Sequence, residues 1–420
     1  MAQQKDRQRT FLVGLETKSP ATGWSASESL DELARLIDTA GGTVVGRDIQ
    51  KLNRPDSATY IGRGKAEELH QIAQEAEVDL IVFDGELSPV QQRNLEAIVQ
   101  CVVIDRTAVI LDIFALRARS REAKLQVELA QLNYMLPRMT GRGVDLSRLG
   151  GGIGTRGPGE TKLEVDRRKI RNRIANVKKE LLEVKAHRAR LRQSRASQPL
   201  PVVALTGYTN AGKSTLHRAL AGSDVLAENR LFATFDATTR RVDPPNGEPF
   251  LLVDTVGFIH KLPTFLVAAF RSTLEEVKEA DLLLHVVDAG HPKRDEQMET
   301  VQSVLDEIGA ANKPMLLVYN KWDQMAGSDY PHPFRQTNTV AVSALTGENM
   351  DALQHAIQQA LSARRVTVEV TIPFDKTEWV SWIFDHGRML AHQHRLDGTY
   401  IKVELEKNLA NKLSRQLKDM

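Results

Sequence analysis

The chain has 420 residues, of which 26% are charged, and its formal net charge is only +2. A chain of this length can bury several cores, so we expect two to four domains. Its single cysteine, Cys101, excludes a disulfide framework and a cysteine-based zinc site, and we expect this residue in a core. The polar N-terminus and the lack of an apolar run of about 18 residues argue against a signal peptide or a membrane span. We therefore expect a cytoplasmic protein.

The first 115 residues alternate strand and helix patterns. Apolar runs near 11–15, 42–46, 79–83 and 101–104 predict strands, and amphipathic stretches near 27–39, 64–76 and 89–99 predict helices between them. This alternation indicates a small α/β domain with a parallel sheet, which we assign to residues 1–115. Asp84 and Asp105 follow two of these strands. They are candidate site residues, although helix capping is the favoured interpretation.

Residues 117–195 carry most of the positive charge. They contain 21 Lys and Arg against 8 Asp and Glu, a net +13, so the remainder of the chain carries −11. Two heptad-like apolar rows predict an antiparallel helical hairpin over residues 116–198. The rows are Leu125, Leu129, Leu132, Leu136 and Met139, then Leu163, Ile170, Ile174, Val177, Leu181, Val184 and Leu191. Six glycines in residues 150–159 form the expected tip between the two helices.

We expect this basic hairpin, 117–195, and its tip, 150–159, to contact RNA phosphates, because the charge exceeds what solubility requires. No aromatic ladder accompanies the charge, so a shaped RNA surface fits better than stacked single-strand bases. A solvated charged face with a flexible tip is the alternative interpretation.

A complete G-x-x-x-x-G-K-[ST] motif follows the strand-like run 201–205 and precedes a helix-like run. Its glycines allow backbone N–H groups to surround phosphate oxygens at a helix N-terminus. Lys213 is expected to reach the β- and γ-phosphates, and the Ser214 hydroxyl to bind Mg²⁺. The predicted contacts are Gly207, Tyr208, Thr209, Asn210, Ala211, Gly212, Lys213, Ser214 and Thr215. The motif predicts a nucleoside triphosphate site.

Two further segments complete the predicted phosphate site. Asp254, after the apolar run 250–253, is expected to hold Mg²⁺ through water, and the Gly257 N–H to meet the γ-phosphate. In the first switch segment, 231–240, Thr234 is our choice for the second Mg²⁺ ligand, with Thr238 and Thr239 as rivals. The nucleotide contacts expected from these segments are Phe232, Ala233, Thr234, Phe235, Asp236, Asp254, Thr255, Val256 and Gly257. The expected catalytic groups are Lys213, Thr234 and Gly257.

The base is specified by Asn320-Lys321-Trp322-Asp323, which follows the apolar run 315–319. The Asp323 carboxylate offers two acceptors to guanine's N1–H and amino group, whereas adenine has a donor at neither place. Asn320 is expected to tie this loop to the phosphate loop, and the Lys321 stem to lie along the purine. Ser343, Ala344 and Leu345 follow another strand-like run and are expected to cover the guanine. The sequence therefore predicts a GTP site.

These motifs resemble the HflX family of ribosome-associated GTPases over nearly the whole chain. The most diagnostic stretches lie outside the nucleotide motifs, at 105–132 and 150–168. The resemblance implies an α/β fold with a P-loop GTPase domain at 199–365, mostly parallel with helices on both faces, and a small α/β domain at 366–420. It also implies binding to the large ribosomal subunit, with splitting or rescue of stalled ribosomes. We expect a monomer. An assembly factor for the large subunit, and a protein-regulating switch without an RNA partner, remain alternatives.

Two residues refine the expected mechanism. Phe258 follows the glycine of the Asp-x-x-Gly motif, where many GTPases place a glutamine that orients the attacking water. A phenyl ring cannot hydrogen-bond, so we expect slow intrinsic hydrolysis that the ribosome accelerates. Asn210 stands where similar GTPases recruit K⁺, so K⁺ stimulation is a hypothesis.

Overall fold

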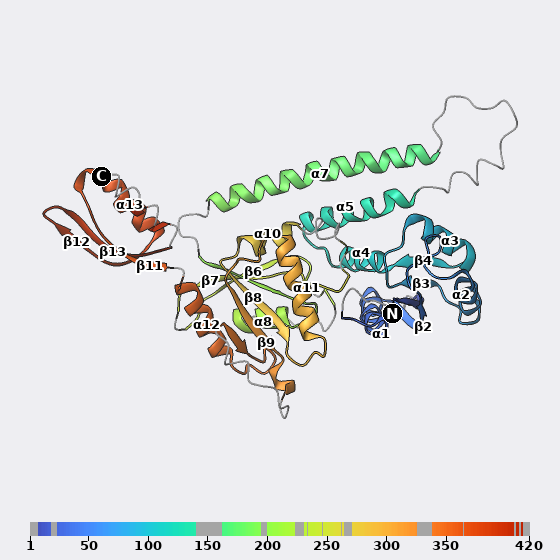
Figure 1. The fold of residues 1–420 in the computed structure, drawn as a ribbon. Helices are drawn as coiled ribbons and strands as arrows, with labels where there is room; N and C mark the ends of the chain where they lie inside the picture. The colour runs from blue at the N-terminus through green and yellow to red at the C-terminus, as the bar shows by residue number, and fades with distance from the viewer. Residues whose placement is uncertain are drawn as a thin grey trace, which may run out of the picture.

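A computed structural model gives the structure of the chain. It describes residues 7–17, 23–139, 162–194, 200–222, 231–232, 234–245, 247–261, 263, 271–325, 338–363, 365–406, 409–410 and 413–414. The expected α/β fold is confirmed: three sheets follow one another along the chain, and a helical hairpin lies between the first two (Figure 1). No helix in these ranges is both long enough and apolar enough to cross a bilayer.

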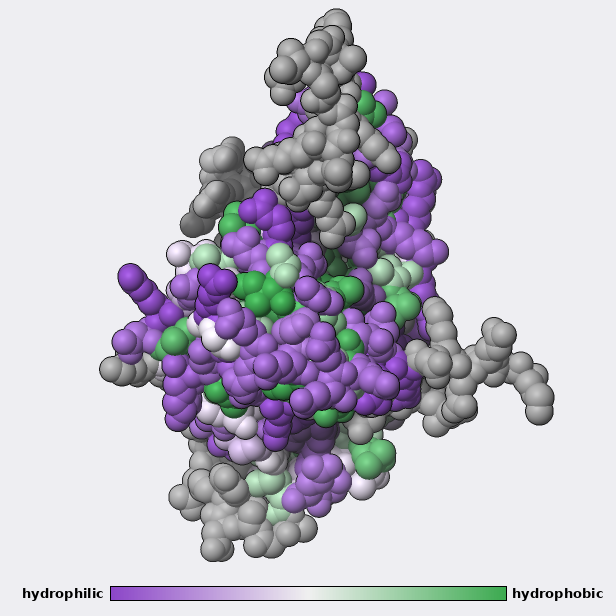
Figure 2. Space-filling view, turned by 90° about the vertical axis from the view of Figure 1, so that its right-hand side faces the viewer, coloured by the Kyte–Doolittle hydropathy of each residue, from purple (hydrophilic) through white to green (hydrophobic). Residues whose placement is uncertain are grey.

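The N-terminal sheet is parallel and has the order β2-β1-β3-β4. Its elements are β1 (Arg9–Glu16), α1 (Ala26–Ala40), β2 (Thr43–Lys51), α2 (Arg63–Glu75), β3 (Leu80–Phe83), α3 (Pro89–Val99) and β4 (Val102–Asp105). Ser25 and Ser88 begin α1 and α3 with complete capping boxes, which explains why these helices start where they do. Figure 2 views the side of the molecule on which this domain lies, and mostly hydrophilic residues cover that face.

In the described part of the connection to the second sheet lie the helices α4 (Arg106–Arg117), α5 (Arg121–Arg138) and α7 (Lys162–Ser194). Figure 1 shows α5 and the longer α7 lying side by side, with α7 continuing above the second sheet. Leu125, Ile174 and Val177 of the predicted apolar rows are buried. Arg173 of α7 pairs with Glu128 of α5 through two hydrogen bonds of 2.6 and 2.7 Å. The predicted tip, 150–159, lies outside the described residues.

The central sheet has six strands in the order β10-β9-β8-β5-β7-β6, and only β6 runs antiparallel to its neighbour. Its strands are β5 (Val202–Gly207), β6 (Thr238–Val242), β7 (Phe250–Asp254), β8 (Leu282–Asp288), β9 (Met315–Asn320) and β10 (Thr339–Ala341). Its helices are α8 (Lys213–Ala221), α10 (Arg271–Glu279), α11 (Arg294–Glu307), the short 3₁₀ helix η1 (Trp322–Met325) and α12 (Met350–Ser362). Because β5, β8 and β9 are parallel, the loops at their carboxyl ends meet at one edge of the sheet.

The C-terminal sheet is antiparallel, in the order β11-β13-β12. It comprises β11 (Arg365–Ile372), the 3₁₀ helix η3 (Phe374–Lys376), α13 (Thr377–His386), β12 (Arg388–Arg395) and β13 (Gly398–Glu406). Ile383 of α13 packs with Ile401, Val403 and Leu405 of β13 in a separate core. In Figure 1 this sheet lies on the far side of the central domain from the N-terminal sheet.

The largest hydrophobic core crosses a domain border. It joins Leu12 and Trp24 of the N-terminal region, Phe114 of α4, and Tyr208 and Phe258 of the central domain. The N-terminal domain, the hairpin and one face of the central sheet therefore pack as a continuous apolar unit. Apolar burial of this extent stabilises the interface between the two domains more than a few surface contacts could.

Candidate nucleotide site

The phosphate loop joins β5 to α8 in a backbone conformation that glycine permits. Gly212 has φ +92°, and a Cβ added there would lie 2.1 Å from the Asn320 amide nitrogen. Gly207, at φ +146°, would bring a Cβ within 2.2 Å of the Val286 carbonyl oxygen. These two glycines are required by positive φ and by close approach of neighbouring atoms. The loop therefore keeps its N–H groups free of side-chain bulk at the start of α8.

Lys213 is buried at the first position of α8. Its ammonium donates to the carbonyl oxygens of Gly207 at 3.0 Å and Tyr208 at 2.7 Å, within its own loop. Burial lowers the pKa of Lys213 to about 8, and the nearby Asp254 carboxylate partly opposes that shift. A buried ammonium that donates to carbonyl oxygens is well suited to pair with an incoming phosphate anion.

The three predicted Mg²⁺ ligands lie together. Thr234 Oγ1 donates to Asp254 Oδ2 at 2.7 Å and is 2.7 Å from Ser214 Oγ. Among the described residues, Asp254 Oδ1 is buried and accepts no hydrogen bond. Two hydroxyls beside a buried carboxylate with an unused oxygen are the hard oxygen donors that Mg²⁺ prefers. The residues present thus fit this metal, and the position of Thr234 favours it over Thr238 and Thr239, which are exposed on β6.

The segment after β7 lies directly against the phosphate loop. The Phe258 N–H donates to the Gly207 carbonyl at 3.1 Å, and the Thr209 N–H donates to the Phe258 carbonyl at 2.7 Å. Thr255 Oγ1 donates to the carbonyl of Leu205 at 2.6 Å, which anchors the start of the segment in the sheet. The Phe258 side chain is buried in the large core. It therefore offers no polar group to a water molecule near the phosphates.

Residues 320–323, which are predicted to bind the base, are joined to the phosphate loop through Asn320. The buried Asn320 amide donates to the Ala211 carbonyl at 2.9 Å, and its oxygen accepts from the Ala344 N–H at 3.0 Å. Lys321 donates to Asp288 at 2.7 Å. Within the part of the chain that the structure describes, Asp323 Oδ1 is buried and has no hydrogen-bond partner. The Asn320 side chain thus joins its own loop to those of Ala211 and Ala344. The nearby Asp323 oxygen can accept a hydrogen bond from a ligand.

The remaining predicted contacts lie in several places. Ser343 closes a turn by accepting from the Thr346 N–H at 3.2 Å, and Leu345 is 79% exposed next to it. By contrast, the side chains of Phe232, Phe235 and Asp236 are engaged away from the phosphate loop, on the α4–α5 junction. Ala233 lies outside the described residues. Thr215, Val256 and Trp322 neighbour the site through their positions in α8, the segment after β7 and η1.

Comparison with known proteins identifies the family. Family models match residues 27–115 (GTP-binding GTPase N-terminal), 117–195 (GTP-binding GTPase middle region), 202–321 (50S ribosome-binding GTPase) and 333–420 (HflX C-terminal domain). GTPase HflX of Caldanaerobacter subterraneus is 46% identical over 97% of this chain and 94% of its own length. GTPase HflX of Escherichia coli is 44% identical over 82% of each chain.

The chain belongs to the HflX family of GTPases. It is accordingly a GTP-binding protein that hydrolyses GTP, as the sequence motifs predicted. A solved GDP complex of a GTP-binding protein from Sulfolobus solfataricus is also similar, with 25% identity, a TM-score of 0.44, and coverage of 85% of this chain and 99% of that one.

Sequence reasoning missed a buried polar network that connects this HflX-family site to the N-terminal domain. The Tyr208 hydroxyl, inside the phosphate loop, donates to Glu32 of α1 at 2.6 Å and accepts from the His260 N–H at 2.6 Å. Arg106, which is 2% exposed, pairs with Glu32 and, at 2.8 Å, with Asp84. The bulky Tyr208 within the phosphate loop was the one signal in the sequence. Its partner lies 176 residues away, which no local pattern reveals.

The charges of this network balance. Burial would raise the pKa of Asp84, but the Arg106 and Lys261 charges hold it below its ordinary value. Lys261, three residues after Phe258, pairs with Asp84 and donates to Ser29 Oγ at 3.1 Å. Asp84 is therefore an ion-pair residue and not a helix cap. Asp105, in contrast, caps α4 by accepting from the Ala108 N–H at 3.0 Å, as expected.

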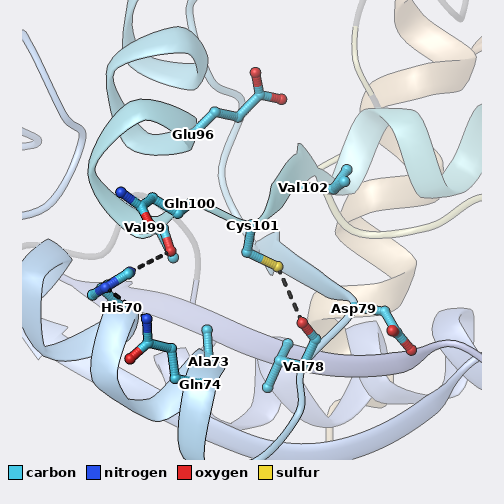
Figure 3. A pocket seen from close by; sticks show the side chains of 10 residues that line it. All are labelled: His70, Ala73, Gln74, Val78, Asp79, Glu96, Val99, Gln100, Cys101 and Val102. Atoms are coloured by element: carbon cyan, nitrogen blue, oxygen red, sulfur yellow. Dashed lines mark hydrogen bonds between the residues drawn. The ribbon is translucent and has the colours of Figure 1, made fainter.

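Cys101 lies far from this chemistry. It is half-buried at the start of β4, and its thiol donates to the Val78 carbonyl at 3.3 Å. Figure 3 shows it beside His70 and Gln74 around an open cavity of about 590 Å³. Burial raises the pKa of the Cys101 thiol, which keeps it protonated and unreactive. The expected core position is therefore met only in part, because Cys101 is half-buried and packs against the N-terminal core.

Proposed function

We propose that this GTPase binds the large ribosomal subunit and acts as a GTP-dependent factor that splits or rescues stalled ribosomes. The observation that carries the proposal is the basic face of α7. Arg168, Arg171, Lys178 and Lys179 are exposed, and their spacing places them on one side of the helix. The apolar residues Ile174 and Val177, which flank this basic face, are buried on a helix that packs against α5. A rigid, cationic helix of this kind suits phosphate-rich RNA.

The nucleotide site supports a switch. Lys213 and the loop N–H groups would hold the β- and γ-phosphates, and Ser214, Thr234 and Asp254 would hold Mg²⁺. When bound, Mg²⁺ neutralises charge between the β- and γ-phosphate oxygens. Thr234 and the Gly257 N–H would then report the presence of the γ-phosphate, and hydrolysis would release both segments. Ribosome affinity is thus expected to be high with GTP and low with GDP.

The hydrolysis step explains why a partner is needed. The buried Phe258 ring cannot orient the attacking water, so intrinsic turnover is slow. The ribosome would accelerate it by ordering the segments that carry Thr234 and Gly257. Asn210 stands in the phosphate loop where similar GTPases recruit K⁺, so K⁺ stimulation is a further hypothesis. Equal turnover in KCl and NaCl with large subunits present would reject that hypothesis.

Because the expected partner is the ribosome, we place the protein in the cytoplasm, acting as a monomer. Light scattering of intact ribosomes, mixed with the protein and a non-hydrolysable GTP analogue, tests the splitting role. A splitting factor lowers the signal. An unchanged signal together with tight binding to isolated large subunits would instead favour the alternative, an assembly factor that uses the same site.

The same preparation tests whether RNA is contacted at all. If the hairpin binds rRNA phosphates, subunit affinity must fall steeply with salt, with a log–log slope close to the number of neutralised phosphates. A shallow slope would favour a protein-regulating switch without an RNA partner. Charge-neutral variants of Lys178 and Lys179 should flatten the slope, because both side chains are exposed on α7.

A further inference from the structure

The described residues just before β6, 231–232 and 234–237, contact two parts of the molecule at once. Thr234 lies at the proposed metal site, 2.7 Å from Asp254 Oδ2. Two residues later, the Asp236 carboxylate points to the beginning of α5. It accepts from the N–H groups of Arg119 at 2.8 Å and Ser120 at 3.0 Å, and from the Ser120 hydroxyl. One short segment thus spans from the nucleotide site to the hairpin.

Asp236 completes the N-terminus of α5. Ser120 is the N-cap residue, and its oxygen accepts from the Ala123 N–H at 3.1 Å. N–H groups at a helix start have no partner within the helix, and the helix dipole favours a negative charge there. Hydrogen bonds to a carboxylate are also roughly twice as strong as those between neutral groups. The beginning of α5 is therefore held by a side chain from the switch segment.

Aromatic packing fixes the same contact. The buried rings of Phe232 and Phe235 lie 4.6 and 4.9 Å from the ring of Phe114 on α4, measured between centroids. Because two residues of chain span at most about 7 Å, a large displacement of Thr234 also displaces Phe232, Phe235 or Asp236.

The other end of α5 is anchored in the N-terminal domain. Arg138 donates to the Leu87 carbonyl at 2.7 Å and to Asp105 at 3.1 Å, and Tyr134 donates to Asp105 at 2.9 Å. The C-terminal end of α5 is thus fixed to the N-terminal domain, and its N-terminal end contacts Asp236 of the switch segment. A change at that end alters how α5, and α7 packed on it, are held.

We propose that Asp236 transmits the nucleotide state to the basic hairpin. With GTP bound, Thr234 stays at the metal site and Asp236 stays on α5. After hydrolysis the segment leaves, and the start of α5 loses its carboxylate partner. The inference rests on the proposed function only in requiring that the γ-phosphate controls this segment. It adds the residue through which that control reaches the helices expected to contact RNA.

Hydrogen–deuterium exchange of the free full-length protein tests the inference without the ribosome. At saturating nucleotide, amides near Arg119 and Ser120 should exchange about tenfold more slowly with a non-hydrolysable GTP analogue than with GDP. In Asp236→Asn, which keeps the side-chain shape, the ratio should fall below about twofold. Asp243→Asn is the matched control, because Asp243 lies exposed just after β6 and pairs with Arg241. It should retain the full ratio.

The outcomes separate this inference from the proposed function. If the switch segment responds to nucleotide while the start of α5 does not, the coupling is wrong and the switch still stands. Retention of the full ratio in Asp236→Asn also overturns the coupling. If neither segment responds in the wild type, the switch model itself fails, and the coupling with it. Loss of the ratio in Asp236→Asn but not in Asp243→Asn supports the coupling.

Discussion

Replacing Asp323 by Asn should change which base the site accepts. Asp323 Oδ1 is buried without a partner among the described residues, so its oxygen is available to guanine. Asn keeps one acceptor but places an NH₂ against a guanine donor. Hydrogen bonds to a charged group contribute about 1.5–3 kcal/mol each, so one lost bond and one conflict cost about 3 kcal/mol together. That loss corresponds to GTP binding on the order of a hundredfold weaker.

Xanthine carries a carbonyl where guanine carries its amino group, so the new amide should donate to it. Titration with fluorescent GTP and XTP should show Asp323→Asn losing GTP and gaining XTP. Thermal unfolding of the nucleotide-free protein should be unchanged, because no hydrogen bond of the fold is removed at Oδ1. Asp295→Asn, a 78% exposed acid on α11, is the control for loss of charge. Unaltered GTP affinity with continued exclusion of XTP would refute the role of Asp323.

Three further predictions concern the loop and the buried network. Because the Lys213 pKa is about 8 in the free protein and phosphate binds only its charged form, GTP affinity should fall about fourfold from pH 7 to pH 8.5; a flat titration would contradict this. Gly212→Ala should abolish nucleotide binding in equilibrium dialysis, because its Cβ would lie 2.1 Å from the Asn320 amide nitrogen; retained binding would show that the loop adjusts. Arg106→Ala should lower the free energy of unfolding in urea by about 3–5 kcal/mol at pH 7, since it strips the partner from buried carboxylates. Pairing with Arg106 holds the pKa of Asp84 below its ordinary value, so the loss should shrink only in acid below the usual range of an Asp carboxyl, as Asp84 becomes protonated; a pH-independent loss would point to packing alone.

Local patterns were sufficient for much of the fold. The N-terminal strands and helices follow hydrophobic periodicity closely, and Ser25 and Ser88 mark two helix starts. The phosphate loop, Thr234 and Asn320 could be placed because each motif carries its chemistry within a few residues. The C-terminal strand β12 could not be predicted, because its sequence, Arg388–Arg395, contains no β-branched residue and pairs with β13.

Long-range contacts could not be predicted. Phe232, Phe235 and Asp236 were expected at the nucleotide because they flank Thr234, but the structure engages their side chains with α4 and α5. That preference arises from Phe114 and the N-terminus of α5, which lie more than 100 residues earlier in the chain. The Tyr208–Glu32 contact likewise depends on how two domains pack. Such contacts become visible only once tertiary structure is known.

The central claim is that this GTP site is controlled by the large ribosomal subunit. GTP turnover measured with and without purified large subunits, at saturating GTP and Mg²⁺, tests it most directly. Slow intrinsic turnover that rises at least tenfold with subunits, and falls back when salt weakens their binding, is the result expected from Phe258 and the basic α7 face. Turnover that is fast without subunits, or unchanged by them, would contradict the account.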